Sequence, residues 1–181
     1  MSVSLHPLDV RGADRAALVE LLTRNHFPFH VVPRPTVDGV ERWIVSGRYD
    51  DEDHAASWVD VEGQGRVGLV VLEDLTDDAP LFDLRLAERF RGRGLAAPVL
   101  RAVTAHVFAT RPRVHRFEGQ TREDNVAMRR AFVRCGFVKE AHYRDGWPVE
   151  GGDPVASVAY AVLRRDWVSG TTTPVPWSDE P

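Results

Sequence analysis

The sequence predicts a single domain of mixed α/β class, and three observations support this. With 181 residues and 43% hydrophobic content, the chain can bury one sizeable core without the help of disulfides. Segments with strand-like and helix-like hydrophobic periodicity follow one another along it. A glycine-rich loop at residues 91–96 joins a strand-like segment to a helix-like one. We expect one domain over residues 1–168 and an extended or disordered tail, rich in threonine and proline, over residues 169–181.

The first elements alternate between strand and helix. Residues 3–8 predict a strand, and residues 13–24 carry apolar side chains at the spacing of an amphipathic helix. Residues 25–34 contain prolines and two histidines and predict an irregular connection. Residues 37–46 predict a short helix that ends at Gly47, because glycine favours the position after a helix.

The middle of the chain predicts three strands. Residues 56–61 and 66–72 are β-like and are joined by the glycine turn at residues 63–65, which predicts a hairpin. In residues 81–87, apolar and polar side chains alternate, as in a strand that buries one face. This last strand leads directly to the glycine loop.

The second half predicts two helices and three strands. Residues 95–110 have apolar side chains on one face and predict a helix, and residues 116–121 predict a strand. Residues 125–135 predict a helix that has Asp124 or Asn125 as its cap and ends at Gly136. Residues 138–147 and 155–163 predict a closing pair of long strands.

The glycine loop reads Arg-Gly-Arg-Gly-Leu-Ala and predicts an anion site. Glycines let the backbone approach a ligand, and the first N–H groups of a helix lack partners inside it. These donors and the positive end of the helix dipole suit a pyrophosphate. The loop lacks the lysine of a nucleoside-triphosphate loop and the three-glycine spacing of a dinucleotide fold.

Two motifs resemble those of the GNAT family of N-acetyltransferases. Arg91-x-x-Gly94-x-Ala96 resembles the family's acetyl-coenzyme A signature, and residues 121–137 resemble its second cofactor motif, which ends in Gly-Phe. They occur in the family's order, and the resemblance covers residues 3–167. Glu140, Arg144, Tyr160 and the ending at residues 163–167 resemble the branch that acetylates ribosomal protein N-termini and many small amines.

The resemblance implies a fold, a donor and an acceptor. The fold would be a mixed, mostly antiparallel central sheet of about seven strands flanked by helices. Acetyl-CoA would be the co-substrate, without a metal, and the acceptor would be a primary amine of a small molecule or a protein N-terminus. The residues implied to contact the cofactor are Leu84, Arg85, Leu86, Arg91, Gly92, Arg93, Gly94, Leu95, Ala96, Asn125 and Phe132.

The transfer needs a base that deprotonates the amine. Glu118 is favoured, on the same face of its strand as Gln120, where related enzymes often have a glutamate. A solvated or arginine-paired carboxylate is an equally good interpretation of Glu118. The other candidates for the base are Asp83, His26, His30 and His142.

The transfer also needs a proton for the departing thiolate. Many relatives use a tyrosine at the position of Phe132, which has no proton to give. Tyr143 is the candidate in its place, with solvent as the alternative, whereas Cys135 is better explained as buried packing. Acceptor choice should depend on residues 25–48.

Charge and cysteine content restrict partners and compartment. A net charge of −4 argues against general nucleic-acid binding, and no segment is apolar over a membrane-spanning length. The single cysteine excludes an intramolecular disulfide. We expect a cytoplasmic enzyme that forms a homodimer and binds neither membrane nor nucleic acid. The alternative is a non-catalytic acyl-CoA-binding sensor or partner module, which Phe132, Gln120 and Ala156 would favour because each departs from the family's pattern.

Overall fold

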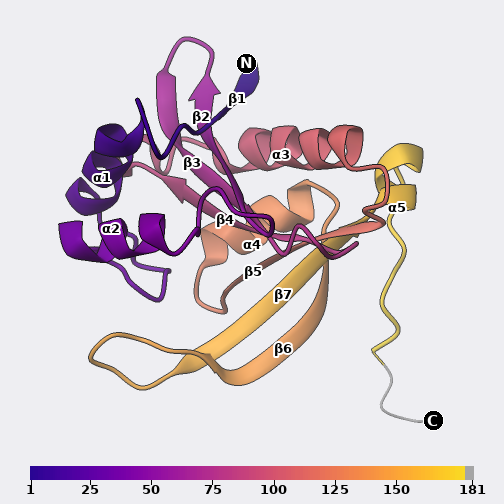
Figure 1. Ribbon diagram of the computed structural model, residues 1–181. Helices are drawn as coiled ribbons and strands as arrows, with labels where there is room; N and C mark the ends of the chain where they lie inside the picture. Colours follow the sequence, from indigo (N-terminus) through magenta and orange to yellow (C-terminus); the bar gives the residue numbers. More distant parts are fainter. Residues whose placement is uncertain (178–181) are drawn as a thin grey trace.

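The computed structural model describes residues 1–177 (Figure 1). All seven predicted strands and all four predicted helices are confirmed, with ends that differ from the prediction by no more than about two residues. A short 3-10 turn and a C-terminal helix were not predicted, because neither is long enough to show a periodicity. The elements are β1 (Val3–Pro7), α1 (Arg15–Arg24), α2 (Val37–Val45), β2 (Ala55–Val61), β3 (Gly65–Glu73), β4 (Leu81–Leu86), η1 (Glu88–Phe90), α3 (Ala96–Thr110), β5 (Arg116–Arg122), α4 (Val126–Arg134), β6 (Val138–Trp147), β7 (Val155–Leu163) and α5 (Arg164–Ser169).

The seven strands form two sheets, with strand orders β1-β2-β3-β4 and β5-β7-β6. Every pairing inside the two sheets is antiparallel. The sheets meet where β4 and β5 begin, because the N–H of His115 donates to the carbonyl of Asp78 and the N–H of Glu118 donates to that of Pro80. Beyond Glu118, β4 and β5 run in the same direction without forming a ladder, so one edge of β4 remains open.

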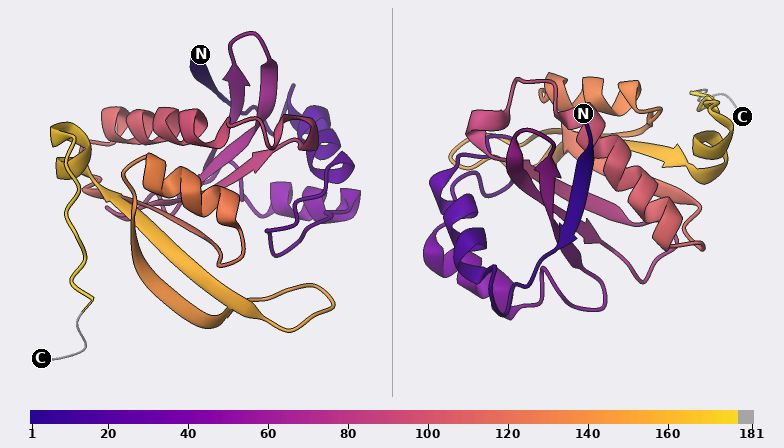
Figure 2. Two further views of the ribbon diagram at one scale, coloured as in Figure 1. Left: turned by 180° about the vertical axis from the view of Figure 1, so that it is seen from behind. Right: turned by 90° about the horizontal axis from the view of Figure 1, so that it is seen from above.

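The four-stranded sheet is covered on both faces. On one face, Trp58 and Leu69 pack with the apolar sides of α1 and α2. On the other, Val59 and Val70 pack with the apolar side of α3. The view from above shows α3 lying across this sheet (Figure 2). Since both faces of β3 are buried, this strand is an almost continuous run of buried residues and not a simple alternation.

An aromatic cluster holds the two sheets together. Phe132 of α4 stacks on Tyr160 of β7 at 4.8 Å between ring centroids, and lies 6.1 Å from Phe82 of β4. The rings of Phe82 and Phe132 pass directly over Gly119 of β5, where an added Cβ would come within 2.7 Å of both. This close approach explains a glycine in the middle of a strand, a position where glycine otherwise weakens the sheet.

The C-terminal segment is described as far as residue 177. Thr173 donates its N–H and its hydroxyl to the buried Asp166 of α5, at 2.7 and 2.8 Å. After α5, residues 171–177 form neither helix nor strand, and residues 178–181 of the predicted tail lie outside the described residues. Within residues 1–177, no helix is both long enough and apolar enough to cross a membrane.

Candidate functional site

The glycine loop lies between η1 and α3 and has the backbone that its sequence predicts. Gly92 and Gly94 have φ values of 71° and 76°, in the left-handed region that favours glycine. Among residues 1–177, no hydrogen-bond partner is found for the N–H groups of residues 92–95. The loop therefore presents a row of free donors at the positive end of the 15-residue helix α3.

The side chain of Arg91 holds the start of the loop against neighbouring segments. Its Nε donates to the carbonyl of Leu86 at 2.8 Å, and its Nη1 donates to the carbonyl of His26 at 2.5 Å. The guanidinium also lies over the ring of Phe27, 5.0 Å from the centroid. Burial lowers the pKa of Arg91, although Glu88 opposes this effect. Arg91 thereby ties residues 26 and 27 to the end of β4.

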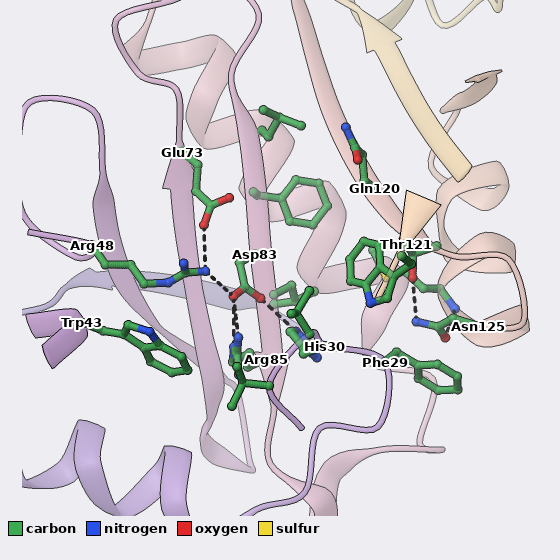
Figure 3. Close-up of a pocket in the computed structure, with 17 residues that line it drawn as sticks. Phe29, His30, Trp43, Arg48, Glu73, Asp83, Arg85, Gln120, Thr121 and Asn125 are labelled. Carbon is green, nitrogen blue, oxygen red and sulfur yellow. Dashed lines mark hydrogen bonds and ion pairs between the residues drawn. The ribbon is translucent and has the colours of Figure 1, made fainter. Parts of the chain in front are cut away.

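Asn125 caps α4 on the opposite side of the site. Its Oδ1 accepts a hydrogen bond from the N–H of Met128 at 3.2 Å, and its Nδ2 donates to Oγ1 of Thr121 at 2.9 Å (Figure 3). The cap fixes the start of α4 beside the end of β5.

The loop and α4 form the two sides of a cavity of about 530 Å³, which we call the loop cavity. Apolar side chains supply most of its wall, as is usual for cofactor sites. Its lining includes Phe27, Leu84, Leu86, Arg91, Gly92, Gly94, Leu95, Ala96, Asn125 and Met128.

A second cavity of about 590 Å³, the inner cavity, adjoins the loop cavity. Residues 29–32 form one side of it, β4 forms its floor, and the ends of β5 and α4 form the other side (Figure 3). The two cavities share Phe29, His30, Leu84, Asn125 and Met128. Molecules bound in the two cavities would therefore contact each other beside Leu84, at the open edge of β4.

Charged side chains gather in the inner cavity around Asp83 of β4. The carboxylate of Asp83 lies 2.9 Å from Nε2 of His30, 3.0 Å from Nη2 of Arg85 and 3.4 Å from Nη2 of Arg48. Burial would raise the pKa of Asp83, but the combined charges of Arg85, His30 and Arg48 hold it well below the ordinary value. Asp83 is therefore a fixed anion, unsuited to act as a base.

Glu73 of β3 is the second carboxylate in this cavity, and its Oε1 lies 3.2 Å from Nη2 of Arg48. Burial raises the pKa of Glu73, and the neighbouring Asp83 adds to the effect, while Arg48 opposes it. Arg48 thus serves two carboxylates simultaneously, and its guanidinium lies over the ring of Trp43 at 5.4 Å.

The structure places most of the predicted cofactor residues around the two cavities. Two of the predicted residues line neither. Phe132 lies in the aromatic cluster with 1% of its surface exposed, because its ring closes the gap above Gly119. Arg93 points away over the ring of Phe90. Arg85 lines the inner cavity, Leu86 lines the loop cavity, and Leu84 lines both.

The two predicted catalytic residues line neither cavity. Glu118 forms an ion pair with Arg116 at 2.7 Å, and Arg116 also binds Glu140. Burial raises the pKa of Glu118, and the charge of Arg116 opposes this. Tyr143 of β6 is 50% exposed. The arginine-paired interpretation of Glu118 is the one that matches its contacts.

The histidine alternatives are placed differently from one another. His30 lies where the two cavities meet, with 23% of its side chain exposed and with Nδ1 buried and unpartnered. His142 pairs with Glu123 on the surface of β6, and His26 contributes its carbonyl to Arg91. Cys135 is buried, with Sγ 3.3 Å from the carbonyl of Ala97, and burial raises the pKa of its thiol.

The segment predicted to control acceptor choice contributes to the inner cavity, and its role toward an acceptor stays a prediction. Phe29, Trp43 and Arg48, all within residues 25–48, line the inner cavity. Sequence analysis did not identify Arg48 and Glu73, because only the fold brings them next to Asp83. Among residues 1–177, no group of three or more His, Cys, Asp or Glu side chains is arranged to hold a metal ion.

Comparisons with known proteins agree with this geometry. The model of the acetyltransferase (GNAT) domain family matches residues 3–138. No curated protein matches the chain in sequence. Among solved structures, spermidine N-acetyltransferase from Vibrio cholerae in complex with CoA and spermine superimposes with a TM-score of 0.77 at 19% identity, covering 92% of this chain and 98% of that one.

A second solved structure supports the same fold. The ribosomal L7/L12 alpha-N-protein acetyltransferase RimL, in complex with coenzyme A, has a TM-score of 0.75 at 19% identity and covers 90% of this chain and 94% of that one. The family match spans most of the chain, from the first strand to the start of β6, and includes the glycine loop and α4. The chain therefore belongs to the family of GNAT acetyltransferase domains.

Proposed function

We propose that the protein transfers the acetyl group of acetyl-CoA to a primary amine of a small molecule or of a protein N-terminus. The observation that carries this proposal is the meeting of the loop cavity and the inner cavity beside Leu84. A donor in one cavity and an acceptor in the other would place the reacting atoms side by side, and positioning supplies much of the rate of such a transfer.

In this proposal the loop cavity holds the donor. The free N–H groups of residues 92–95 bind the pyrophosphate, and the dipole of α3 adds to the attraction. The pantetheine arm runs along the open edge of β4 at residues 84–86 and bonds to its backbone as an added strand would. Asn125 and Met128 border the arm from the side of α4.

We propose His30 as the base, held in place by Asp83. Imidazole is the side chain that exchanges a proton near neutral pH, and His30 borders both cavities. If Nε2–H donates to Asp83, the unpartnered Nδ1 carries the lone pair, and it accepts the amine proton once the acceptor displaces the side chains that bury it. The amine nitrogen then bonds to the thioester carbon, the carbon–sulfur bond breaks, and solvent protonates the thiolate.

Two variants separate this base from the one predicted by sequence. We expect His30→Gln to lower kcat about 100-fold, within the range of general-base contributions. Glu118→Gln should change kcat less than about twofold, because Glu118 faces Arg116 and not the cavities. The opposite pattern of losses would assign the base to Glu118.

Release of free thiol from acetyl-CoA across a panel of primary amines tests the function itself. We expect release that depends on both the amine and the protein and that saturates with acetyl-CoA. A folded protein that binds acetyl-CoA but releases no thiol above background with any amine would instead be an acyl-CoA-binding sensor or partner module.

We further propose that the protein works in the cytoplasm as a homodimer. A single buried cysteine suits a reducing compartment. The strand β6 lies at the edge of its sheet and has exposed residues at 142–146, so its outer side is open to a second chain. Sedimentation at micromolar concentration would show a single species of about twice the 20.3 kDa chain mass.

A further inference from the structure

We infer, building on the proposed function, that the acceptor is an amine with a single positive charge and an apolar body, and that Arg48 excludes diamines and polyamines. The inner cavity carries this inference, because its charges already neutralise one another and its remaining walls are largely apolar.

The two carboxylates of the cavity each face a guanidinium. Glu73 lies 3.2 Å from Arg48, and Asp83 lies 3.4 Å from Arg48 and 3.0 Å from Arg85. Asp83 also binds Nε2 of His30. Two arginines against two carboxylates leave no net negative charge, so a second ammonium group of the acceptor finds no carboxylate without a partner (Figure 3).

The remaining walls suit an apolar body. Phe29, Trp43, Trp147, Val31 and Val32 line the cavity. Placing an ammonium group against such a surface costs free energy unless a hydrogen-bonded or charged partner compensates for its lost water. A hydrocarbon or aromatic group gains free energy on the same surface, in proportion to the apolar area that it buries.

Arg48 is the residue on which this balance depends. It follows α2 directly, with its N–H donating to the carbonyl of Trp43 at 3.2 Å. Its guanidinium is the cation that faces Glu73, whereas Asp83 retains Arg85 when Arg48 is removed. Loss of the Arg48 charge would leave the carboxyl group of Glu73 free to pair with a second ammonium group of the acceptor.

A matched pair of amines tests the substrate class in the wild-type protein. Hexylamine and 1,6-diaminohexane have the same chain length and differ by one terminal amine. We expect kcat/KM, measured by thiol release from acetyl-CoA, to be at least about tenfold higher for hexylamine, which corresponds to about 1.4 kcal/mol. Spermidine should be as poor an acceptor as the diamine.

Charge variants test the role of Arg48. Arg48→Gln should lower the preference for hexylamine over the diamine at least about fivefold, and Arg48→Lys, which keeps the charge, should restore the wild-type ratio. Adding Glu73→Gln to Arg48→Gln should also restore it. The control Arg24→Gln removes an arginine that is 77% exposed and pairs with Glu20 on α1, and it should leave the ratio unchanged.

The outcomes are distinct. A wild-type protein that acetylates the diamine or spermidine as well as hexylamine, or an Arg48→Gln variant that folds and keeps the wild-type ratio, would overturn the inference and leave the proposed function intact. No thiol release with any amine would overturn the proposed function and the inference together. If Arg48→Gln does not fold, the wild-type ratio decides alone.

Discussion

At the scale of residues, Asp83 organises the site, because one carboxylate connects parts of the chain that are far apart in sequence. It binds His30 from the irregular segment after α1, Arg48 from the end of α2, and Arg85 from its own strand. Its burial makes each of these contacts strong, and it would make an unpaired charge costly.

The lowered pKa of Asp83 predicts a pH dependence of stability. Because the pKa in the folded protein lies below the ordinary value of 3.8, the contribution of the ionised carboxylate is complete above about pH 4 and is lost as the pH falls toward the folded pKa. We expect the difference in unfolding free energy between the wild type and Asp83→Asn to be constant from pH 5 to 7 and to shrink below about pH 4.

Urea denaturation between pH 7 and pH 3 measures this difference. Glu73→Gln is the control, because burial raises the pKa of Glu73 and its ionisation opposes folding. For this variant the stability relative to the wild type should instead rise as the pH increases above about 4.5. A difference for Asp83→Asn that stays constant down to pH 3 would contradict the account of Asp83.

Single residues of the site differ in how well the sequence predicted them. The glycines at 92 and 94 and the cap at Asn125 depend on local backbone chemistry, which a sequence shows directly. His30 and Asp83 are 53 residues apart and come together only through the fold. His30 lies in a segment without periodicity, so the sequence offered it only as one candidate among several.

At the scale of elements, the contact between β4 and β5 decides where the cavities open. The two strands are bonded to each other at their beginnings, and α4 then packs across them through Phe132. The open edge of β4 beyond this junction is where we propose that the cofactor binds.

A substitution in β5 tests this junction. An added Cβ at Gly119 would lie 2.6 Å from Phe132 and 2.7 Å from Phe82, so Gly119→Ala should cost about 1–3 kcal/mol of unfolding free energy through overpacking. Chemical denaturation measures the loss. The second substitution Phe132→Leu should recover part of it in the double variant, because the smaller side chain makes room.

The matched control is Gly152→Ala, where the nearest heavy atom to an added Cβ is 3.6 Å away. It should change stability by less than about 0.5 kcal/mol. If Gly119→Ala is as stable as this control, the close packing over β5 is not what holds the two sheets together.

The sequence predicted the long elements well and their assembly less completely. Periodicity located every strand and the four longer helices, whereas η1 and α5 are three and six residues long and show none. The separation of the seven strands into sheets of four and three was not predicted. This separation depends on which strand edges meet. The aromatic packing around Gly119 accompanies it, and this packing joins residues that are far apart in the sequence.

At the scale of the whole molecule, the proposed function depends on the arrangement of two cavities around one strand. The glycine loop and α4 enclose the cavity that we propose for the donor, and residues 25–48 contribute to the cavity that we propose for the acceptor. The two proposed sites therefore come from different parts of the chain.

Two glycines with the same left-handed backbone conformation allow a controlled test of the proposed donor site. Gly94 and Gly63 both have φ near 76°, and an added Cβ would meet nothing within 4 Å at either position. Valine at either position therefore costs about 1–2 kcal/mol of backbone strain without a clash. Only Gly94 belongs to the loop cavity, whereas Gly63 lies in the turn between β2 and β3.

Calorimetric titration of acetyl-CoA into the wild type, Gly94→Val and Gly63→Val is the most direct measurement. The account predicts one acetyl-CoA per chain, an affinity at least about tenfold weaker in Gly94→Val, and unchanged affinity in Gly63→Val, although strain lowers the stability of both variants. A folded wild type that binds no acetyl-CoA at high micromolar concentration, or equal affinities in the two variants, would contradict it.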